Sequence, residues 1–368
     1  MLKNLGSTHA KNKNDEIQCE PFICPTLITV SIIFGHYGQK TFKARKSTSL
    51  TKVQGTFVKQ IIKFANTMTQ VTVIIHGRIA QQQQLQAEFE HQFGYVVQWR
   101  STKYAGHATE LAAQAAAEGC THLIAIGGDG TIHEVANGLL RSKHPEVAIG
   151  ILPRGSGNDF VRTLKSPNTI FELVAAIKNN QYQYIDVGQC SFVDINGLPN
   201  QRYLINIADI GIGGIIAEKM SRSNRWAGAF LTYQYHIISS LLRYKKQRID
   251  IKADTFDLQT PIMSAVIANG KYFGKALGIA PDATPNSGHF QAIVLGNISL
   301  LDYIRHLTDL RACRRITHPE VSYHNTKDIT LSHINKPLPI DIDGEFVGYT
   351  PLRIQVLPQA LRFLSYGV

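Results

Sequence analysis

Two segments of the chain share one order: an apolar strand, a glycine turn and a helix. Residues 121–126 (THLIAI) lead through GGDG into TIHEVANGLL, and residues 146–153 (EVAIGILP) lead through RGSG into NDFVRTL. Two earlier strands, VTVIIH from residue 71 and YVVQWRST ending at Thr102, are each followed by a helical stretch. Strands that alternate with helices of about 10–15 residues predict a parallel sheet between two layers of helices. We expect this three-layer α/β domain to cover residues 69–187.

The pattern changes after Asp186. Runs such as RIDIKAD, SAVIANG, FQAIVLG and DITLSH are short, rich in β-branched residues and separated by turn residues, which is typical of an antiparallel sheet or sandwich. We therefore expect a second, β-rich domain over residues 188–354, interrupted by a helix at about 225–243. The last apolar piece, LRFLSYG within residues 355–368, could pair with the strands of either domain.

Residues 1–68 show no hydrophobic period and no motif. They hold ten basic and three acidic residues, a balance of +7, so most of the chain's net charge of +11 lies here. The composition predicts either a disordered arm or translated sequence upstream of a true start at Met68. The rest of the chain is only mildly basic, which suits a protein that visits an anionic membrane surface better than a dedicated nucleic-acid binder.

Cysteine usage and hydropathy point to a reducing, cytoplasmic compartment. The apolar run at residues 25–34 is much shorter than the roughly 20 residues that span a bilayer, and no clean basic stretch precedes it as in a secretory signal. The cysteines form neither a CxxC pair nor a zinc-like spacing with histidine. They are Cys19, Cys24, Cys120, Cys190 and Cys313.

The turn GGDGT at residues 127–131 predicts a phosphate site. Glycines let backbone amides approach a phosphate closely, and the following helix directs its positive end and free amides to the same place. A carboxylate among phosphates is repulsive unless a cation lies between them, so Asp129 predicts Mg²⁺. Thr131 and Glu134 match a T-x-x-E capping box at the start of the helix. A plain turn with a helix cap is the alternative.

The second turn, RGSG at residues 154–157, also joins a strand to a helix. The Ser156 hydroxyl could donate to a phosphate oxygen, and Asn158 could cap the helix that follows. The carboxyl ends of parallel strands share one edge of a sheet, where open α/β sheets bind ligands. The two turns should therefore face one crevice, which predicts a single nucleotide site.

The segment PIDIDGEF carries three carboxylates, Asp341, Asp343 and Glu345. Asp-Gly between alternating strands predicts a hairpin. If the segment instead stays extended, residues i, i+2 and i+4 share a face, and three like charges there require solvent, a metal or a raised pKa. A carboxyl group with a raised pKa is a candidate general base. The residues alone leave both interpretations open.

In its motifs the chain resembles the catalytic domain of diacylglycerol kinases, a family of bacterial lipid kinases with sphingosine and ceramide kinases as more distant members. The resemblance runs from about Val71 to the C-terminus. GGDGT also occurs in NAD kinases, whereas GSGNDF and IDGE are more specific for lipid kinases. These segments lie in the family's order and spacing: GGDGTIHEVANGLL, ILPRGSGNDFVRTL, Asp186-Val187-Gly188, NGKYFGKALGIAPDA and IDGE.

The resemblance implies a nucleotide domain followed by a β-rich lipid domain, with the active site between them. It implies a kinase that uses ATP and Mg²⁺ and transfers the γ-phosphate to a lipid hydroxyl. Glu345 in IDGE would be the catalytic base, and Asp129 would act on Mg²⁺ as the second catalytic residue. The residues implied to contact ATP are Thr102, Gly127, Gly128, Asp129, Gly130, Thr131, Ile132, His133, Gly155, Ser156 and Gly157.

Three features depart from the family's usual pattern. The loop HGRIA at residues 76–80 stands where the family usually has Asn-Pro-x-Ser-Gly, and Arg154 replaces a usually uncharged residue. Ser287 stands where bacterial members commonly have an aspartate that helps to hold a structural Mg²⁺. We therefore expect no second metal at this place.

Alternatives to this interpretation remain at the level of function. A soluble kinase resembling NAD kinases and a non-catalytic lipid- or nucleotide-binding relative are the rivals. Diacylglycerol, a sphingoid base, phosphatidylglycerol and a polyprenol all fit as the acceptor. The amphipathic stretch 225–243, flanked by basic residues, is a candidate for peripheral contact with the membrane, with ordinary packing as the alternative. We expect no nucleic-acid partner, and a homodimer is compatible with the sequence.

Overall fold

The computed structural model describes residues 70–94, 97–142, 144, 146–164, 166–223, 239–240 and 242–366. The expected N-terminal extension and most of the expected helix at 225–243 lie outside these ranges, so the interpretations placed on them stay predictions. All described residues belong to one compact unit, Phe64–Val368. Within the described ranges, no helix combines the length and apolarity needed to cross a bilayer.

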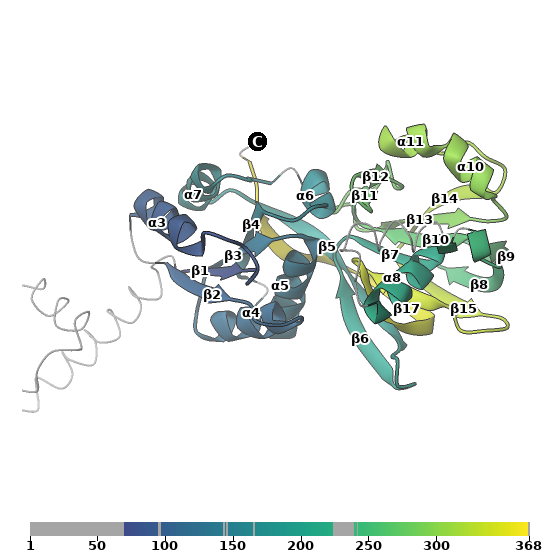
Figure 1. The fold of residues 1–368 in the computed structure, drawn as a ribbon, viewed down its shortest axis with the longest axis horizontal. Helices are drawn as coiled ribbons and strands as arrows, with labels where there is room; N and C mark the ends of the chain where they lie inside the picture. Colours follow the sequence, from purple (N-terminus) through teal and green to yellow (C-terminus); the bar gives the residue numbers. More distant parts are fainter. Residues whose placement is uncertain are drawn as a thin grey trace, which may run out of the picture. The chain divides into compact units, whose positions relative to one another are not determined.

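A parallel sheet forms the first part of this unit (Figure 1). Its strands lie in the order β4-β3-β1-β2. They are β1 (Val71–Ile75), β2 (Gln98–Ser101), β3 (His122–Gly127) and β4 (Ala148–Pro153). β1, β3 and β4 are buried along almost their whole length, as in a sheet with helices on both faces.

Helices cover both faces of the parallel sheet. Side chains alternate between the faces of a strand: Ile74 of β1 packs with α4 and α5, whereas Val73 and Ile75 pack with α3 and α7. This arrangement confirms the expected three-layer α/β class. The helices are α3 (Gln82–Phe93), α4 (His107–Ala117), α5 (Asp129–Ser142), α6 (Asp159–Leu164) and α7 (Ile170–Lys178).

Antiparallel strands form the second part, which confirms the expected β-rich architecture. One layer has the order β14-β13-β10-β7-β16-β17. In the other layer β17 pairs with both β5 and β15; β5 then pairs with β6, and β15 pairs with β8. The strands are β5 (Tyr182–Val193), β6 (Pro199–Leu204), β7 (Ile207–Gly211), β8 (Gln247–Ala253), β9 (Asp257–Ile262), β10 (Ser264–Ala268), β11 (Tyr272–Phe273), β12 (Leu277–Gly278), β13 (Phe290–Leu295), β14 (Val321–Thr326), β15 (Asp328–His333), β16 (Pro339–Ile342) and β17 (Glu345–Leu364). The helices are α8 (Ile212–Arg222), α10 (Leu300–Arg305) and α11 (Leu307–Arg311).

β17 joins the two parts of the unit. Its first half pairs with β16 and β15, whereas Arg362 and Phe363 near its end pair in parallel with β4. β5 runs antiparallel along most of the same strand. The end of the chain therefore adds to the edge of the parallel sheet, and one continuous sheet connects the glycine turns to the β-rich part.

The layer of β7, β10 and β13 is apolar on both faces. Ala265 and Ile267 of β10 face the core between the two layers, whereas Val266 and Ala268 face a separate cluster that includes Leu310 of α11. A strand buried on both faces reads as a continuous apolar run, here SAVIA. Many residues of this outer cluster also line an apolar cavity.

The close crossing of α4 and α5 yields the first prediction. A Cβ at Gly138 would lie 2.4 Å from the Thr109 carbonyl oxygen, whereas a Cβ at Gly130 of the same helix would meet nothing within 4 Å. Gly138→Ala should therefore lower the free energy of unfolding by about 1–3 kcal/mol through overpacking. Gly130→Ala should leave it unchanged or raise it by up to about 1 kcal/mol. Chemical denaturation measures both, and equal stability of the two variants would contradict the crossing.

Candidate active site

The two glycine turns lie against each other at the carboxyl ends of β3 and β4. A Cβ on Gly155 would be 2.4 Å from the Gly128 Cα, so only glycine permits this approach. The Arg154 N–H donates to the Gly127 carbonyl oxygen at 2.7 Å. The expected convergence of the turns is confirmed. Asn158 does not cap α6 as predicted, because its side-chain amide bonds back to the Gly155 backbone at 3.0 and 3.1 Å.

Asp129 connects the first turn to the helix that follows the second. Its Oδ1 accepts a hydrogen bond from the Phe160 N–H of α6 at 3.2 Å. Burial raises the pKa of the Asp129 carboxyl group above its ordinary value, although the amides of α6 oppose the shift. Burial disfavours the ionised form unless a positive charge comes close. A cation beside Asp129 would supply that charge.

A polar cleft opens beside the first turn. Its volume, with the open mouth included, is about 1100 Å³, which is ample for a nucleotide-sized ligand. The Thr102 hydroxyl oxygen accepts the Gly77 N–H at 3.0 Å and so ties two of the lining loops together. Both predicted ATP-contact residues and cationic side chains line this cleft. The predicted residues are Thr102, Gly128, Gly130 and Thr131, and the cationic ones are Arg78 and Lys103.

Two of the predicted ATP contacts direct their side chains elsewhere. Ile132 is fully buried in the core on the α4–α5 side of the sheet. The imidazole of His133 is also fully buried and bonds to the β-rich part of the unit. Neither side chain lines the cleft. Ser156 is exposed in the second turn, and the predicted contacts from it and its flanking glycines stay predictions.

The predicted capping box of Thr131 and Glu134 is wrong. α5 begins at Asp129, two residues before Thr131. The Glu134 carboxylate instead accepts the N–H groups of Gly106 and Ala108, at 2.9 and 3.0 Å, and thereby caps the neighbouring helix α4. The T-x-x-E pattern is local, and the close packing of α4 against α5 offers Glu134 different donors.

The PIDIDGEF segment forms a hairpin, so the alternative that its three carboxylates share one extended face is wrong. β16 ends at Ile342 and β17 begins at Glu345. Asp343 and Gly344 form the turn with φ values of 53° and 86°, the left-handed region that a two-residue hairpin turn of type I′ requires. The three carboxylates of this segment consequently lie in different environments.

Asp343 fixes this hairpin to the rest of the site. Its oxygens accept the N–H groups of Ile205, Asn206 and Ile207 at 2.9 Å each. His133 Nδ1, which comes from α5, lies 2.6 Å from the same carboxylate. Four donors thus replace the water that a buried carboxylate loses. Asp343 joins the hairpin, the β6–β7 connection and a helix of the nucleotide part.

Arg202 of β6 connects His133 to Glu345. Its Nε donates to His133 Nε2 at 2.8 Å, and its terminal nitrogen forms an ion pair with the Glu345 carboxylate. Because a guanidinium group only donates, Nε2 accepts, and His133 carries its proton on Nδ1 and donates it to Asp343. Arg202 was not among the residues predicted from the sequence, because it lies 143 residues before Glu345 in a segment without a recognisable motif.

A second, acidic cleft lies next to the hairpin. It holds about 1030 Å³, open mouth included. Gly344 lines it, and the predicted base Glu345 is the next residue along the chain. Asp159 is satisfied by the β11–β12 turn, since it accepts the N–H groups of Lys275 and Ala276 at 2.9 and 2.6 Å. The aspartates that line this cleft are Asp129, Asp159, Asp209, Asp341 and Asp343.

Asp209 and Asp341 are paired residues on neighbouring strands β7 and β16. Burial raises the pKa of Asp209 to about 6, although a hydrogen bond from the Ser264 hydroxyl opposes the shift. Burial also raises the pKa of Asp341 well above its ordinary value, and the nearby Asp209 raises it further. Two buried carboxyl groups this close favour the protonated form. Asp341 is therefore a carboxyl group of the PIDIDGEF segment with a raised pKa.

The residues present fit Mg²⁺ at Asp129. In the described part of the chain, no three His, Cys, Asp or Glu side chains are arranged to chelate a metal by themselves. Mg²⁺ in phosphoryl-transfer sites is bound through one or two carboxylates, with water and substrate phosphates completing its shell. Asp129, at the junction of the two glycine turns, is suited to that role.

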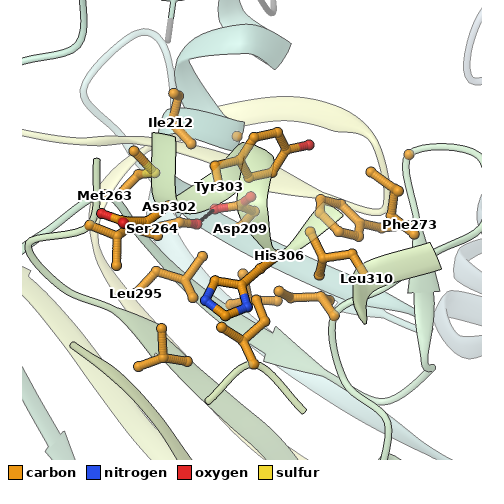
Figure 2. A pocket seen from close by; sticks show the side chains of 18 of the residues that line it. Asp209, Ile212, Met263, Ser264, Phe273, Leu295, Asp302, Tyr303, His306 and Leu310 are labelled. Atoms are coloured by element: carbon orange, nitrogen blue, oxygen red, sulfur yellow. Dashed lines mark hydrogen bonds between the residues drawn. The ribbon is translucent and has the colours of Figure 1, made fainter. Parts of the chain in front are cut away.

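An apolar cavity adjoins the acidic cleft (Figure 2). It measures about 900 Å³ with its mouth included. Asp209, Ile216 and Phe273 line both the cleft and the cavity, so the two spaces adjoin each other. The walls come largely from β7, β10, β13, α8 and the α10–α11 pair. Most of the lining is aliphatic or aromatic, and its polar groups include the hydrogen-bonded Asp209–Ser264 pair, Asp302 and His306.

Two family models match the chain over most of the described unit. Residues 70–190 match the diacylglycerol kinase catalytic domain. Residues 207–365 match the YegS C-terminal NAD kinase beta sandwich-like domain. The first match contains both glycine turns and Asp129, and the second contains the acidic cleft's Asp209, the apolar cavity and the IDGE hairpin.

Several diacylglycerol kinases are similar to the chain over most of their own length. A diacylglycerol kinase of Staphylococcus carnosus is 29% identical over 271 residues, which is 73% of this chain and 84% of the relative. A diacylglycerol kinase of Bacillus subtilis is 29% identical over 73% of this chain and 85% of its own. The crystal structure of a diacylglycerol kinase from Bacillus anthracis superposes with a TM-score of 0.60 at 19% identity, covering 82% of this chain and 98% of that one. This structural likeness shows a shared fold.

The raised pKa of Asp209 predicts an unusual pH dependence of stability. Between the ordinary carboxyl pKa and about 6, the folded protein holds a proton that the unfolded chain has lost, so this contribution to stability is lost as pH rises through that window. Asp209→Asn should therefore gain stability relative to the parent protein as pH rises from about 4 to 7, by on the order of 2 kcal/mol.

Asp328→Asn serves as the matched control, because a hydrogen bond from Arg353 lowers the pKa of the Asp328 carboxyl group. Its contribution has the opposite sign and is lost as pH falls. Urea unfolding across the pH range measures both variants. Parallel stability curves for Asp209→Asn and the parent protein would contradict a protonated Asp209.

Proposed function

Because this chain belongs to the diacylglycerol kinase catalytic-domain family, we propose that it is an ATP- and Mg²⁺-dependent lipid kinase whose acceptor is diacylglycerol or a related lipid. Kinase activity follows from the family. One observation supports a lipid acceptor above all others: the acidic cleft beside the glycine turns adjoins an apolar cavity and shares lining residues with it. A hydroxyl group in the cleft could thus be attached to an acyl chain in the cavity.

The nucleotide half of the reaction requires positioning and charge neutralisation more than covalent chemistry. The glycine turns offer backbone amides to the triphosphate, and Arg78 and Lys103 line the polar cleft with positive charge. Asp129 would hold Mg²⁺, which when bound neutralises charge that develops on the phosphate oxygens. The second turn lies against the first, which supports the prediction that its residues Ser156 and Gly157 contact the same ligand.

The acceptor half requires a group that takes the hydroxyl proton. The family resemblance gives this role to Glu345, which follows Gly344 at the edge of the acidic cleft. Its ion pair with Arg202 holds the carboxylate at the hairpin. Asp341 is less suited to the role, because burial and the nearby Asp209 raise its pKa and so favour the protonated carboxyl group, which accepts no further proton.

A kinase with a small polar acceptor, as in NAD kinases, is the rival function. Such an acceptor would need a polar pocket beyond the reacting hydroxyl, whereas here the adjoining cavity is lined largely by aliphatic and aromatic side chains. The lipid acceptor therefore fits better. We further propose that the enzyme is cytoplasmic and reaches its lipid as a peripheral membrane protein.

The proposal predicts that Asp129→Asn abolishes lipid phosphorylation. The variant keeps the size of the side chain but removes the negative charge, so the rate should fall by at least a factor on the order of 10²–10³. The fold should remain, because the change removes a buried charge. Radiolabelled ATP with a panel of diacylglycerol, sphingoid base, phosphatidylglycerol and polyprenol measures transfer and identifies the acceptor. An Asp129→Asn protein with near-normal transfer would refute the role of this residue.

The assignment of the base is tested by comparing two neighbours in the hairpin. Glu345→Gln should lower the turnover number by a factor on the order of 10²–10⁴, the usual contribution of general acid–base catalysis. The affinity for ATP should hardly change, because Glu345 lies outside the lining of the polar cleft. Asp341→Asn is the control and should have a much smaller effect. The reverse order of effects would transfer the role of base to Asp341.

A further inference from the structure

We propose that the helix pair α10–α11 is the surface by which this protein docks on an anionic lipid bilayer. The docked pair lets an acyl chain pass from the bilayer into the apolar cavity beneath it. The proposal rests on the lipid acceptor proposed above and adds the place where that lipid enters. The pair covers the outer face of the β7–β10–β13 layer.

The pair presents two different faces. Tyr303, His306 and Leu310 line the cavity, and Figure 2 shows them reaching into it. Leu301 and Ile304 do not line it; their side chains are 64% and 55% exposed. Residues three apart lie on the same side of a helix, so these two form one apolar patch on the outer face of α10. The wall of the cavity and the exposed patch are thus opposite sides of one element.

A capping box at its N-terminus fixes the orientation of α10. Ser299 and Asp302 form a complete capping box, in which the Asp302 N–H donates to the Ser299 hydroxyl oxygen at 3.2 Å and the Asp302 carboxylate accepts the Ser299 N–H at 3.0 Å. The buried side chain of Leu310 anchors α11. The outer patch therefore projects in a defined direction, which an interfacial element requires.

The charge around the patch favours an anionic partner. The segment from residue 299 to 316 carries four arginines and two aspartates. Three aspartates are paired at this surface: Asp309 with His306 and Arg314, Asp302 with Ser299 and Arg305, and Asp282 with Arg315, so the four arginines still outnumber them. Aliphatic residues flanked by arginine are typical of elements that lie in the membrane interface, and cationic side chains strengthen binding to anionic lipids. The arginines, all exposed, are Arg305, Arg311, Arg314 and Arg315.

A second exposed aliphatic pair provides a contrast within the same molecule. Ile195 and Leu198, in the turn between β5 and β6, are 65% and 60% exposed. This turn contains Asp194, and residues 191–201 contain no lysine or arginine. Neither side chain lines the apolar cavity. Exposure alone therefore does not distinguish the two pairs, whereas charge and the adjoining cavity do.

The test is binding of the full-length protein to vesicles, measured by co-sedimentation. Vesicles of phosphatidylcholine with phosphatidylglycerol are compared with vesicles of phosphatidylcholine alone. Leu301→Gln/Ile304→Gln should weaken binding by on the order of tenfold or more, because two aliphatic side chains no longer enter the apolar layer. Arg305→Gln/Arg311→Gln should reduce the preference for phosphatidylglycerol, by roughly fivefold per arginine. Ile195→Gln/Leu198→Gln, the matched control, should bind as the parent protein does.

A kinase assay separates docking from catalysis. The Leu301→Gln/Ile304→Gln variant should phosphorylate dispersed short-chain diacylglycerol at the parent rate and long-chain diacylglycerol in vesicles much more slowly. A parent protein that binds vesicles but phosphorylates no lipid would refute the lipid kinase function and leave the docking surface standing. The docking proposal is overturned if the variant binds vesicles normally, or if the Ile195/Leu198 variant loses as much binding.

Two further measurements keep these outcomes unambiguous. The melting temperature of each variant shows whether it is folded, and the Arg305→Gln/Arg311→Gln variant tests the same face without changing its apolar residues. Sedimentation velocity shows whether the patch instead binds a second copy of the chain. A patch variant that dissociates a dimer and still binds vesicles normally would overturn the proposal in favour of that interface.

Discussion

The Asp343 carboxylate holds together the parts from which the site is built. Three backbone amides of the β6–β7 connection and the imidazole of His133 donate to it. A buried carboxylate that loses such partners is left uncompensated, which is strongly destabilising. Because His133 belongs to α5, the helix of the first glycine turn, this single group sets the distance between the turn and the hairpin. Arg202 then uses the same imidazole to place Glu345.

The acidic cleft contains five aspartates, and the protein stabilises them in different ways. Asp343 has four donors, and Asp159 accepts two amides from the β11–β12 turn, where Lys275 and Ala276 have φ values of 71° and 69°. Such backbone conformations are strained, and the hydrogen bonds to Asp159 offset that strain. Burial raises the pKa of both Asp209 and Asp341, so these two groups favour the protonated form more than an exposed aspartate does. Asp129 accepts the Phe160 amide at the junction of the glycine turns, where we propose that it binds Mg²⁺.

Local patterns in the sequence predicted the fold class and the position of the glycine turns, because strand runs and turn residues are encoded over a few positions. Contacts between distant residues were not predictable in this way. His133 and Asp343 are 210 residues apart, and Asp209 lies within a strand that is buried throughout and reads as core. The capping box failed for the same reason, since the partner of Glu134 comes from another helix. The α10–α11 surface carries no motif and emerged only from the packing.

The two sides of the β7–β10–β13 layer differ in how easily they can open. The inner side packs against a second sheet in a continuous core, where separating the layers would expose many apolar side chains at once. The outer side is covered in part by α10 and α11, of 6 and 5 residues, and helices this short depend on tertiary packing for their stability. Moving that pair would expose fewer apolar side chains than separating the two sheets. We therefore expect an apolar chain to enter the cavity through the outer side, where the exposed patch and the arginines also lie.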